Sequence, residues 1–207
     1  VEIEPAVYDV AKWFEAQNRN VLASPKVHRE VADGREFVAR GGGKYDIVTL
    51  EPLMPYSPAA VYLYTREFYR AARSAMKSDG LLCQWIPPQG VSTADLKRLV
   101  ASVAEAFPHV SLWYFEHAVL VLGAPSRPRV DWASFRERAS RPEVAGDLQR
   151  AHVGGPAHLL GAFLVGKRIL GVQRLVAEAE VRAAPPCAHA GLGNNLHADH
   201  AGLVVLG

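Results

Sequence analysis

The sequence has little of several features that would place it in a specialised class. It contains two cysteines, Cys83 and Cys187, which excludes a disulfide framework and indicates a reducing compartment. Its formal net charge is only +2, so it has no electrostatic footprint for nucleic acid. No apolar run approaches the roughly 20 residues that span a bilayer. Glu2 and Glu4 stand where a signal peptide has its positive residues, so we expect a cytoplasmic protein.

The composition that is present is typical of a globular chain. Of the 207 residues, 49% are hydrophobic and 21% are charged. This length predicts one domain of ordinary size with an extension, or two small domains.

The first 123 residues alternate between strand-like and helix-like segments. Apolar residues at helical spacing follow Pro5, Phe37, Tyr64 and Leu96, and the face after Pro5 is expected to be buried. Ser92 and Asp95 have the spacing of a capping box at the start of the last of these helices. Strands are predicted over Val1–Ile3, Val27–Val31, Tyr45–Leu50, Leu81–Ile86, Val110–Tyr114 and Ala118–Leu122.

Strands that alternate with crossover-length helices predict an α/β fold with a mainly parallel sheet and helices on both faces. The last two strands are too close in sequence for a helix between them, so the final strand must be antiparallel. Tyr45–Leu50 is apolar or β-branched enough to be covered on both faces. Trp85 and Trp113, in later strands, are expected in the core or in the wall of a pocket.

Pro125 and Pro128 mark an expected domain edge after residues 1–124. Helices are predicted over Trp132–Leu148 and Ala157–Val181, in a helical extension covering residues 125–185. Residues 186–207 are rich in Gly, Ala and His and are expected to form a disordered tail. The histidines of this tail do not match the spacings of known metal sites, so no metal is expected.

Three acids lie at the predicted carboxyl ends of strands, where open parallel sheets bind their ligands. Either Glu2 or Glu4 is expected to accept hydrogen bonds from ribose hydroxyls, and Asp33 with Gly34 is expected to meet an adenine amino group. Glu51 would then face the reacting end of the ligand. The alternative is that each acid is a turn former or a helix N-cap, as Asp33 before Gly34 illustrates. For each acid taken singly, a structural role is favoured. For the three acids taken together, a structural role and a ligand-binding role have about equal weight.

Several motifs match a known family in order and spacing. They are VEIEP at Val1–Pro5, DGREF at Asp33–Phe37, YDIVTLEPLMP at Tyr45–Pro55, LYTREFY at Leu63–Tyr69, DGLLCQWIP at Asp79–Pro87 and FPHVSLW at Phe107–Trp113. Over residues 1–123 the chain resembles the spermidine/spermine synthase (polyamine aminopropyltransferase) family. It is most similar to bacterial spermidine synthase-like proteins often fused to transporter-like membrane segments.

The resemblance implies a Rossmann-like fold of the methyltransferase type. It also implies transfer of an aminopropyl group from decarboxylated S-adenosylmethionine, a co-substrate, to a diamine such as putrescine. Glu2 then corresponds to the acid that holds the ribose, and Asp33 and Gly34 to the pair beside the adenine. Glu51 corresponds to the catalytic aspartate.

Two further residues are assigned to the amine site. Gln84 corresponds to a polar residue near the amine, and Tyr64 either lines the amine site or packs in the core. The chemistry agrees with a carboxylate at Glu51, because a primary amine with a pKa of about 10.4 is protonated at neutral pH. A nearby carboxylate attracts this cation and then removes its proton.

Two departures from the family pattern leave alternatives open. The family's first strand and Gly-rich loop are absent, so the chain is expected to lack the N-terminal part of its domain. The stretch after Glu51 lacks the family's second aspartate. An S-adenosylmethionine-dependent methyltransferase and an inactive fragment are therefore kept as alternatives. A homodimer and an upstream membrane segment outside this chain also stay open.

Overall fold

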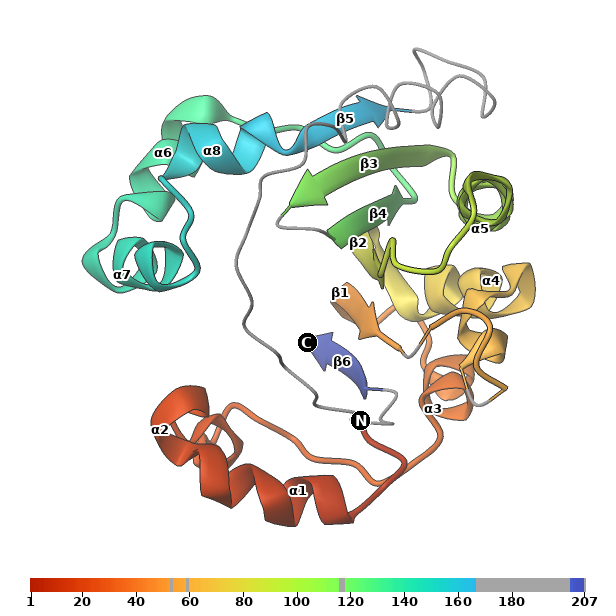
Figure 1. Ribbon diagram of the computed structural model, residues 1–207, viewed down its shortest axis with the longest axis horizontal. Coiled ribbons are helices and arrows are strands. Elements are labelled where there is room, and N and C mark those ends of the chain that lie inside the picture. Colours follow the sequence, from red (N-terminus) through yellow and green to blue (C-terminus); the bar gives the residue numbers. More distant parts are fainter. Residues whose placement is uncertain (53, 59, 116–117, 167–201, 207) are drawn as a thin grey trace.

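The computed structural model describes residues 1–52, 54–58, 60–115, 118–166 and 202–206. Its strands are β1 Tyr45–Glu51, β2 Met76–Ile86, β3 His109–Phe115, β4 Ala118–Ala124, β5 Phe163–Gly166 and β6 Gly202–Leu206. They form one sheet in the order β5-β3-β4-β2-β1-β6 (Figure 1). β1 and β2 are parallel, whereas the other neighbouring pairs are antiparallel, so the described sheet is mixed and not mainly parallel as predicted.

The helices form two groups (Figure 1). α3, α4 and α5 lie together along one side of the sheet, and α1, α2 and α6 to α8 lie on the other side. The α-helices are α1 Ala6–Val10, α2 Glu15–Asn18, α3 Gly34–Arg40, α4 Arg66–Ala75, α5 Thr93–Ala106, α6 Trp132–Ala139, α7 Pro142–Arg150 and α8 Pro156–Gly161. Short 3₁₀ helices cover Ala11–Phe14, Val21–Ala23 and Val61–Tyr64.

Helix N-caps explain where the helices on the sheet begin. The Ser92 hydroxyl accepts a hydrogen bond from the backbone N–H of Asp95 at 3.2 Å and donates to its carboxylate at 2.6 Å, which confirms the predicted start of α5. Thr65 caps α4 in the same manner, accepting from the N–H of Phe68 at 3.3 Å.

The two faces of the sheet differ in burial. In β2 the side chains of Leu82, Gln84 and Ile86 are fully buried beneath the helices, whereas Cys83 and Trp85 on the opposite face are only half-buried. The core therefore lies between the sheet and the group α3 to α5, where Phe68, Tyr69 and Val100 among others are inaccessible to solvent. Burial of these large side chains is the main stabilising term of this layer.

Packing in this layer is tight enough to require a glycine. A Cβ added to Gly123 of β4 would lie 2.8 Å from the ring of Phe107, which follows α5 and is almost completely buried. The absence of a side chain at Gly123 thus lets the Phe107 ring lie directly on the strand.

Several segments differ from the sequence expectation. The helix expected over Trp132–Leu148 is divided between α6 and α7. The helix predicted after Tyr64 ends at Ala75, earlier than expected, because β2 begins at Met76. The expected strand Val27–Val31 is reduced to one parallel bridge between Val31 and Glu2. Phe163–Gly166 is a strand where a helix was predicted, because it pairs with β3. Gly202–Leu206 is a strand paired with β1, although the tail was expected to be disordered.

Two predicted burial patterns are also wrong. Val10 and Phe14, on the helical face after Pro5, are 39% and 48% exposed, because no described element packs fully against this face. Ile47 in β1 is 37% exposed, since α3 to α5 cover only the other face of that strand. The division at residues 124 and 185 stays a prediction, and residues 167–201 lie outside the described part.

Candidate active site

Glu2 lies in the bridge that joins the start of the chain to the segment before α3. Its N–H donates to the carbonyl of Glu30 at 3.0 Å, and its carbonyl accepts from the N–H of Ala32 at 3.1 Å. Its side chain is 7% exposed, and Oε1 accepts from the N–H of Glu4 at 3.0 Å. The backbone next to Glu2 therefore holds one oxygen of its carboxylate.

Asp33 is the N-cap of α3, as the structural reading of the sequence anticipated. Its Oδ1 accepts from the N–H of Arg35 at 2.7 Å and of Glu36 at 3.3 Å. The residue is exposed, and Gly34 directly after it is the first residue of the helix. A carboxylate has about four acceptor positions, so the cap leaves Oδ2 open to a ligand.

Glu51 is the last residue of β1 and is exposed to solvent. Pro52 follows it and is buried, so the chain leaves the strand through a rigid and anchored residue. The carboxylate therefore stands at the carboxyl end of a parallel strand, the position that the sequence predicted.

Two contacts link the segments around the acids. The carbonyl of Glu2 is bonded to Ala32, the residue before Asp33. Two residues after Asp33, the guanidinium of Arg35 lies over the ring of Tyr62, 5.5 Å from its centroid. Tyr62 belongs to the segment that follows Glu51. Glu2 and Asp33 are thus joined through the backbone bridge, and the link toward Glu51 runs through Tyr62, which lies further along the chain.

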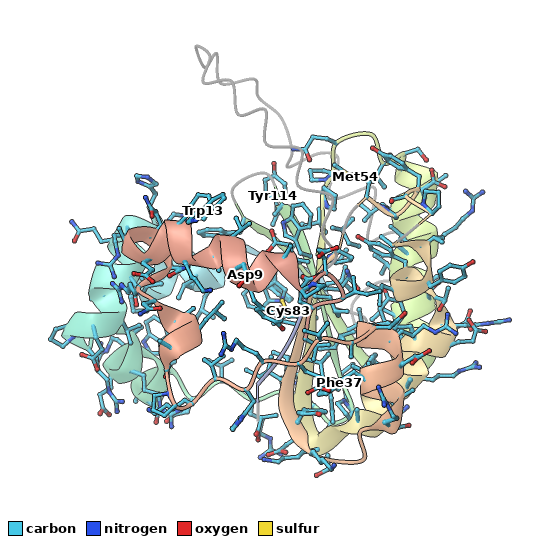
Figure 2. All side chains as sticks on the ribbon, turned by 90° about the horizontal axis from the view of Figure 1, so that it is seen from below. Asp9, Trp13, Phe37, Met54, Cys83 and Tyr114 are labelled. Atoms are coloured by element: carbon cyan, nitrogen blue, oxygen red, sulfur yellow. The ribbon has the colours of Figure 1, made fainter. Side chains whose placement is uncertain are left out.

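The loop after β1 also contacts the loop after β2. A Cβ added to Gly90 would lie 3.2 Å from the hydroxyl of Tyr56, so the phenol rests on this glycine. Gly90 has a φ of +73°, a conformation that a larger residue adopts only with strain. Figure 2 shows Met54, in the loop after β1, at the same end of the molecule as Tyr114 near the end of β3.

The structure does not bring Gln84 to Glu51. Gln84 is fully buried on the face beneath α4, where its Oε1 accepts from the hydroxyl of Tyr69 at 3.3 Å. Its Nε2 donates to the carbonyl of Trp85 at 3.1 Å. Both ends of the amide are therefore used inside the protein, and the geometry favours a supporting role for Gln84 at the end of β2.

Tyr64 ends the 3₁₀ helix before α4 and is 4% exposed. Desolvation by burial raises the pKa of its phenol, so the hydroxyl is neutral throughout the physiological range. The side chain belongs to the buried cluster under α4, which agrees with the packing alternative. Its contact with an amine stays a prediction.

Sequence reasoning missed the contacts of two residues of this region, Tyr69 and Arg35, and it left Trp85 between the core and the wall of a pocket. Tyr69 orients Gln84, Arg35 contacts the loop after Glu51, and Trp85 shares its face of the sheet with Glu51. For Trp85 a signal was present: side chains alternate along a strand, so Trp85 must face away from Leu82 and Gln84. For the other two, the contacts are between distant segments and no local pattern indicates them.

Two cavities lie away from these acids, along α1. One, of about 280 Å³, is lined by residues that include Tyr8, Lys12 and Arg29, and the other, of about 350 Å³, by residues that include Val7 and Phe14. Neither is lined by Asp33, Glu51 or Gln84. The placement of acids at strand ends therefore defines the candidate site.

Within the described residues, no group of three or more His, Cys, Asp and Glu side chains is placed to hold a metal ion. None of the described helices has both the length and the apolar character needed to cross a membrane. Cys187 and the histidines after it lie outside this part.

The fold defines a class of protein, a Rossmann-like α/β domain with acids at the ends of its strands. Solved structures share this fold. A spermidine synthase in complex with the transition state analogue AdoDATO has a TM-score of 0.57 and 17% identity, covering 73% of this chain and 59% of the other. Spermidine synthase from Thermotoga maritima has a TM-score of 0.55 and 17% identity, covering 74% and 58%.

The sequence then specifies the family. The family model described as "Spermine/spermidine synthase domain" matches residues 1–117, more than half of the 207 residues, and the chain belongs to this family. A polyamine aminopropyltransferase of Nitrosomonas europaea is 33% identical over 107 residues, 51% of this chain and 33% of the relative. One of Alkaliphilus oremlandii is 34% identical over 110 residues, 52% and 38% respectively. The chain thus spans between a third and two fifths of the length of these relatives.

Proposed function

We propose that the protein carrying this chain is an aminopropyltransferase that uses decarboxylated S-adenosylmethionine as donor and an amine as acceptor. The observation that supports it most is the exposed carboxylate of Glu51 at the end of β1, in a chain of the spermine/spermidine synthase family. The loop that follows Glu51 is joined to α3 through Arg35 and Tyr62. Donor and acceptor sites would therefore meet at this carboxylate.

The donor nucleoside is assigned to the residues before α3. Glu2 would accept hydrogen bonds from the ribose hydroxyls through the carboxylate oxygen that Glu4 does not use. Asp33 would accept from the adenine amino group through Oδ2 while Oδ1 continues to cap the helix. Gly34 has no side chain to obstruct the base.

Glu51 is assigned the roles of cation anchor and general base. The acceptor binds as an ammonium ion, and Glu51 removes one proton from it. The free electron pair of the nitrogen attacks the propyl carbon bonded to the sulfonium, a new C–N bond forms, and the C–S bond breaks. Its electrons return to sulfur, which leaves as neutral methylthioadenosine. The sulfonium is a good leaving group, so positioning and deprotonation are what the protein must supply.

The hydrogen bonds of Gln84 limit the role that it can have at the acceptor site. Because Tyr69 and the carbonyl of Trp85 engage both ends of its amide, we assign Gln84 to support of the strand end beside the amine. Tyr64 is assigned to the buried end of the loop that follows Glu51. A homodimer, an upstream membrane segment and a cytoplasmic location stay predictions.

The test incubates the protein with an amine and, in separate reactions, with decarboxylated and intact S-adenosylmethionine. Methylthioadenosine from the decarboxylated donor is the expected product. S-adenosylhomocysteine alone would instead identify a methyltransferase on the same fold and overturn the proposal. Binding without turnover is measured as the rise in melting temperature with methylthioadenosine, since a ligand of the native state stabilises it. No product and no rise would identify an inactive domain.

A further inference from the structure

We propose that Arg35 is a positioning residue for aminopropyl transfer, whose guanidinium holds the loop after Glu51 against the start of α3 through the ring of Tyr62. This inference rests on the proposed function and assigns a further residue to its acceptor site. It follows from the contact between Arg35 and Tyr62, from the place where α3 and α4 begin, and from the hydrogen bonds within the loop.

The contact of Arg35 with Tyr62 is specific. The guanidinium lies 5.5 Å from the centroid of the ring, within the range of a cation–π attraction. Within the described residues Arg35 forms no salt bridge and its guanidinium no hydrogen bond, so the ring is the partner that orients it. Both side chains are exposed, Tyr62 by 57%, so burial in the core does not explain why they meet.

The contact joins the donor side of the site to the acceptor side. The N–H of Arg35 donates to Oδ1 of Asp33, the carboxylate assigned to the adenine, at 2.7 Å. Tyr62 lies in the 3₁₀ helix that leads from Glu51 into α4. Because α3 precedes β1 and α4 follows it, both helices begin near the carboxyl end of that strand, and they lie side by side (Figure 1).

Hydrogen bonds make the loop after Glu51 one unit. Each backbone N–H in a series of turns donates to the carbonyl of the preceding member, at 2.8, 3.0 and 2.9 Å, along Met54, Ser57, Ala60 and Leu63. The carbonyl of Tyr62 accepts from the hydroxyl of Thr65 at 3.0 Å, and the same hydroxyl caps α4. Fixing Tyr62 therefore restricts the segment that leads back to Glu51.

A second aromatic side chain holds the loop on its other side. The hydroxyl of Tyr56 rests on Gly90 of the loop after β2, so the loop is supported from α3 and from β2. Its end is anchored in the core by Leu63 and Tyr64. Loss of the Arg35 contact should therefore shift the exposed part of the loop without unfolding the domain.

The test measures methylthioadenosine release from decarboxylated S-adenosylmethionine and putrescine, with each substrate varied in turn. Arg35→Gln should raise KM for putrescine about two- to fivefold, the loss expected for an exposed cation–π contact. Arg35→Lys keeps a cation and should lose less. Arg40→Gln is the matched control, because Arg40 is exposed in the last turn of the same helix, and it should keep the parent KM.

Two further readouts distinguish positioning from support of the fold. The affinity for methylthioadenosine, measured by calorimetry, should stay at the parent value in Arg35→Gln, because the backbone N–H that binds Asp33 is retained. The urea midpoint should also be unchanged. A parallel loss of putrescine binding, methylthioadenosine affinity and stability would show that Arg35 is merely structural and would contradict the inference.

A double-mutant cycle tests the pair itself. Tyr62→Phe keeps the ring and should keep the parent KM for putrescine, whereas Tyr62→Leu should raise it as Arg35→Gln does. Both single variants lose the same contact, so the double variant Arg35→Gln/Tyr62→Leu should be no worse than either. Effects that multiply in the double variant would show that the two residues act independently and would overturn the inference.

The possible results also separate this inference from the proposed function. A parent-like KM for putrescine in Arg35→Gln would overturn the role of Arg35 and leave aminopropyl transfer standing. Absence of methylthioadenosine from the parent protein with every amine would refute aminopropyl transfer itself, and the positioning role with it.

Discussion

The hydroxyl of Tyr69 donates a hydrogen bond to Oε1 of Gln84 at 3.3 Å, and both side chains are completely buried. Burial raises the pKa of the Tyr69 phenol, so the hydroxyl stays a neutral donor at physiological pH. The pair joins α4 to β2 directly behind the strand end that carries Trp85.

Removing this donor should destabilise the protein. Tyr69→Phe leaves the buried Oε1 of Gln84 without its partner, so we expect the free energy of unfolding to fall by about 1–3 kcal/mol. Urea denaturation followed by circular dichroism measures the change. Tyr56→Phe is the control, because Tyr56 is 66% exposed and should change stability by less than about 0.5 kcal/mol. Equal losses in both variants would contradict the role of the buried pair.

Substitutions of Asp33 separate its structural role from its proposed donor role. Asn is as good an N-cap as Asp, so Asp33→Asn should leave the unfolding free energy nearly unchanged, whereas Asp33→Ala should lose about 1 kcal/mol. Both variants lack the carboxylate and should bind methylthioadenosine more weakly, as titration calorimetry would show. Unchanged affinity in the Asn variant would reduce Asp33 to a helix cap.

The glycine beneath Phe107 should not tolerate a methyl group. Gly123→Ala places a Cβ 2.8 Å from the ring, so the ring or the strand must move. We expect a loss of about 1–3 kcal/mol in thermal or urea unfolding. Gly42→Ala is the matched control, since a Cβ there meets nothing within 4 Å. A stable Gly123→Ala variant would show that the packing of α5 on β4 is looser than described.

The capping carboxylate of α5 makes stability depend on pH. Hydrogen bonds from Ser92, and then from Arg98, lower the pKa of Asp95 in the folded state. A depressed pKa contributes stability above the unfolded value of about 3.9, and this contribution is lost as the pH falls below it. The urea midpoint should therefore decline less steeply on acidification in Asp95→Asn, and also in Ser92→Ala, than in the parent. Parallel curves would rule out this linkage.

The sequence predicted what depends on local patterns. Ser92 and Asp95 have the spacing that caps α5, and the apolar run at Tyr45–Leu50 forms β1. It also predicted that Glu51 ends this strand. Contacts between segments that are distant in the sequence could not be predicted from local patterns. Phe163–Gly166 becomes a strand only because β3 offers it an edge, and no helical or strand period in four residues indicates that.

The assignment of Gln84 illustrates why a site residue is harder to predict than a strand. A polar residue near a strand end was expected to meet the amine, but its side chain lies on the same face as Leu82 and Ile86. Counting alternate positions from either of them assigns Gln84 to the helix side and Trp85 to the side of Glu51. The burial that decides which face is the core depends on α4 and α5, which only the structure provides.

The most direct test of the account is the rate of methylthioadenosine release by Glu51→Gln at saturating donor and amine. Glutamine keeps the shape and polarity of Glu51 but removes the base, so kcat should fall about 10²–10⁴-fold. Glu67→Gln, in an exposed acid of α4, should retain the parent rate. A Glu51→Gln rate within a few-fold of the parent would contradict the assignment of Glu51 as the base for aminopropyl transfer.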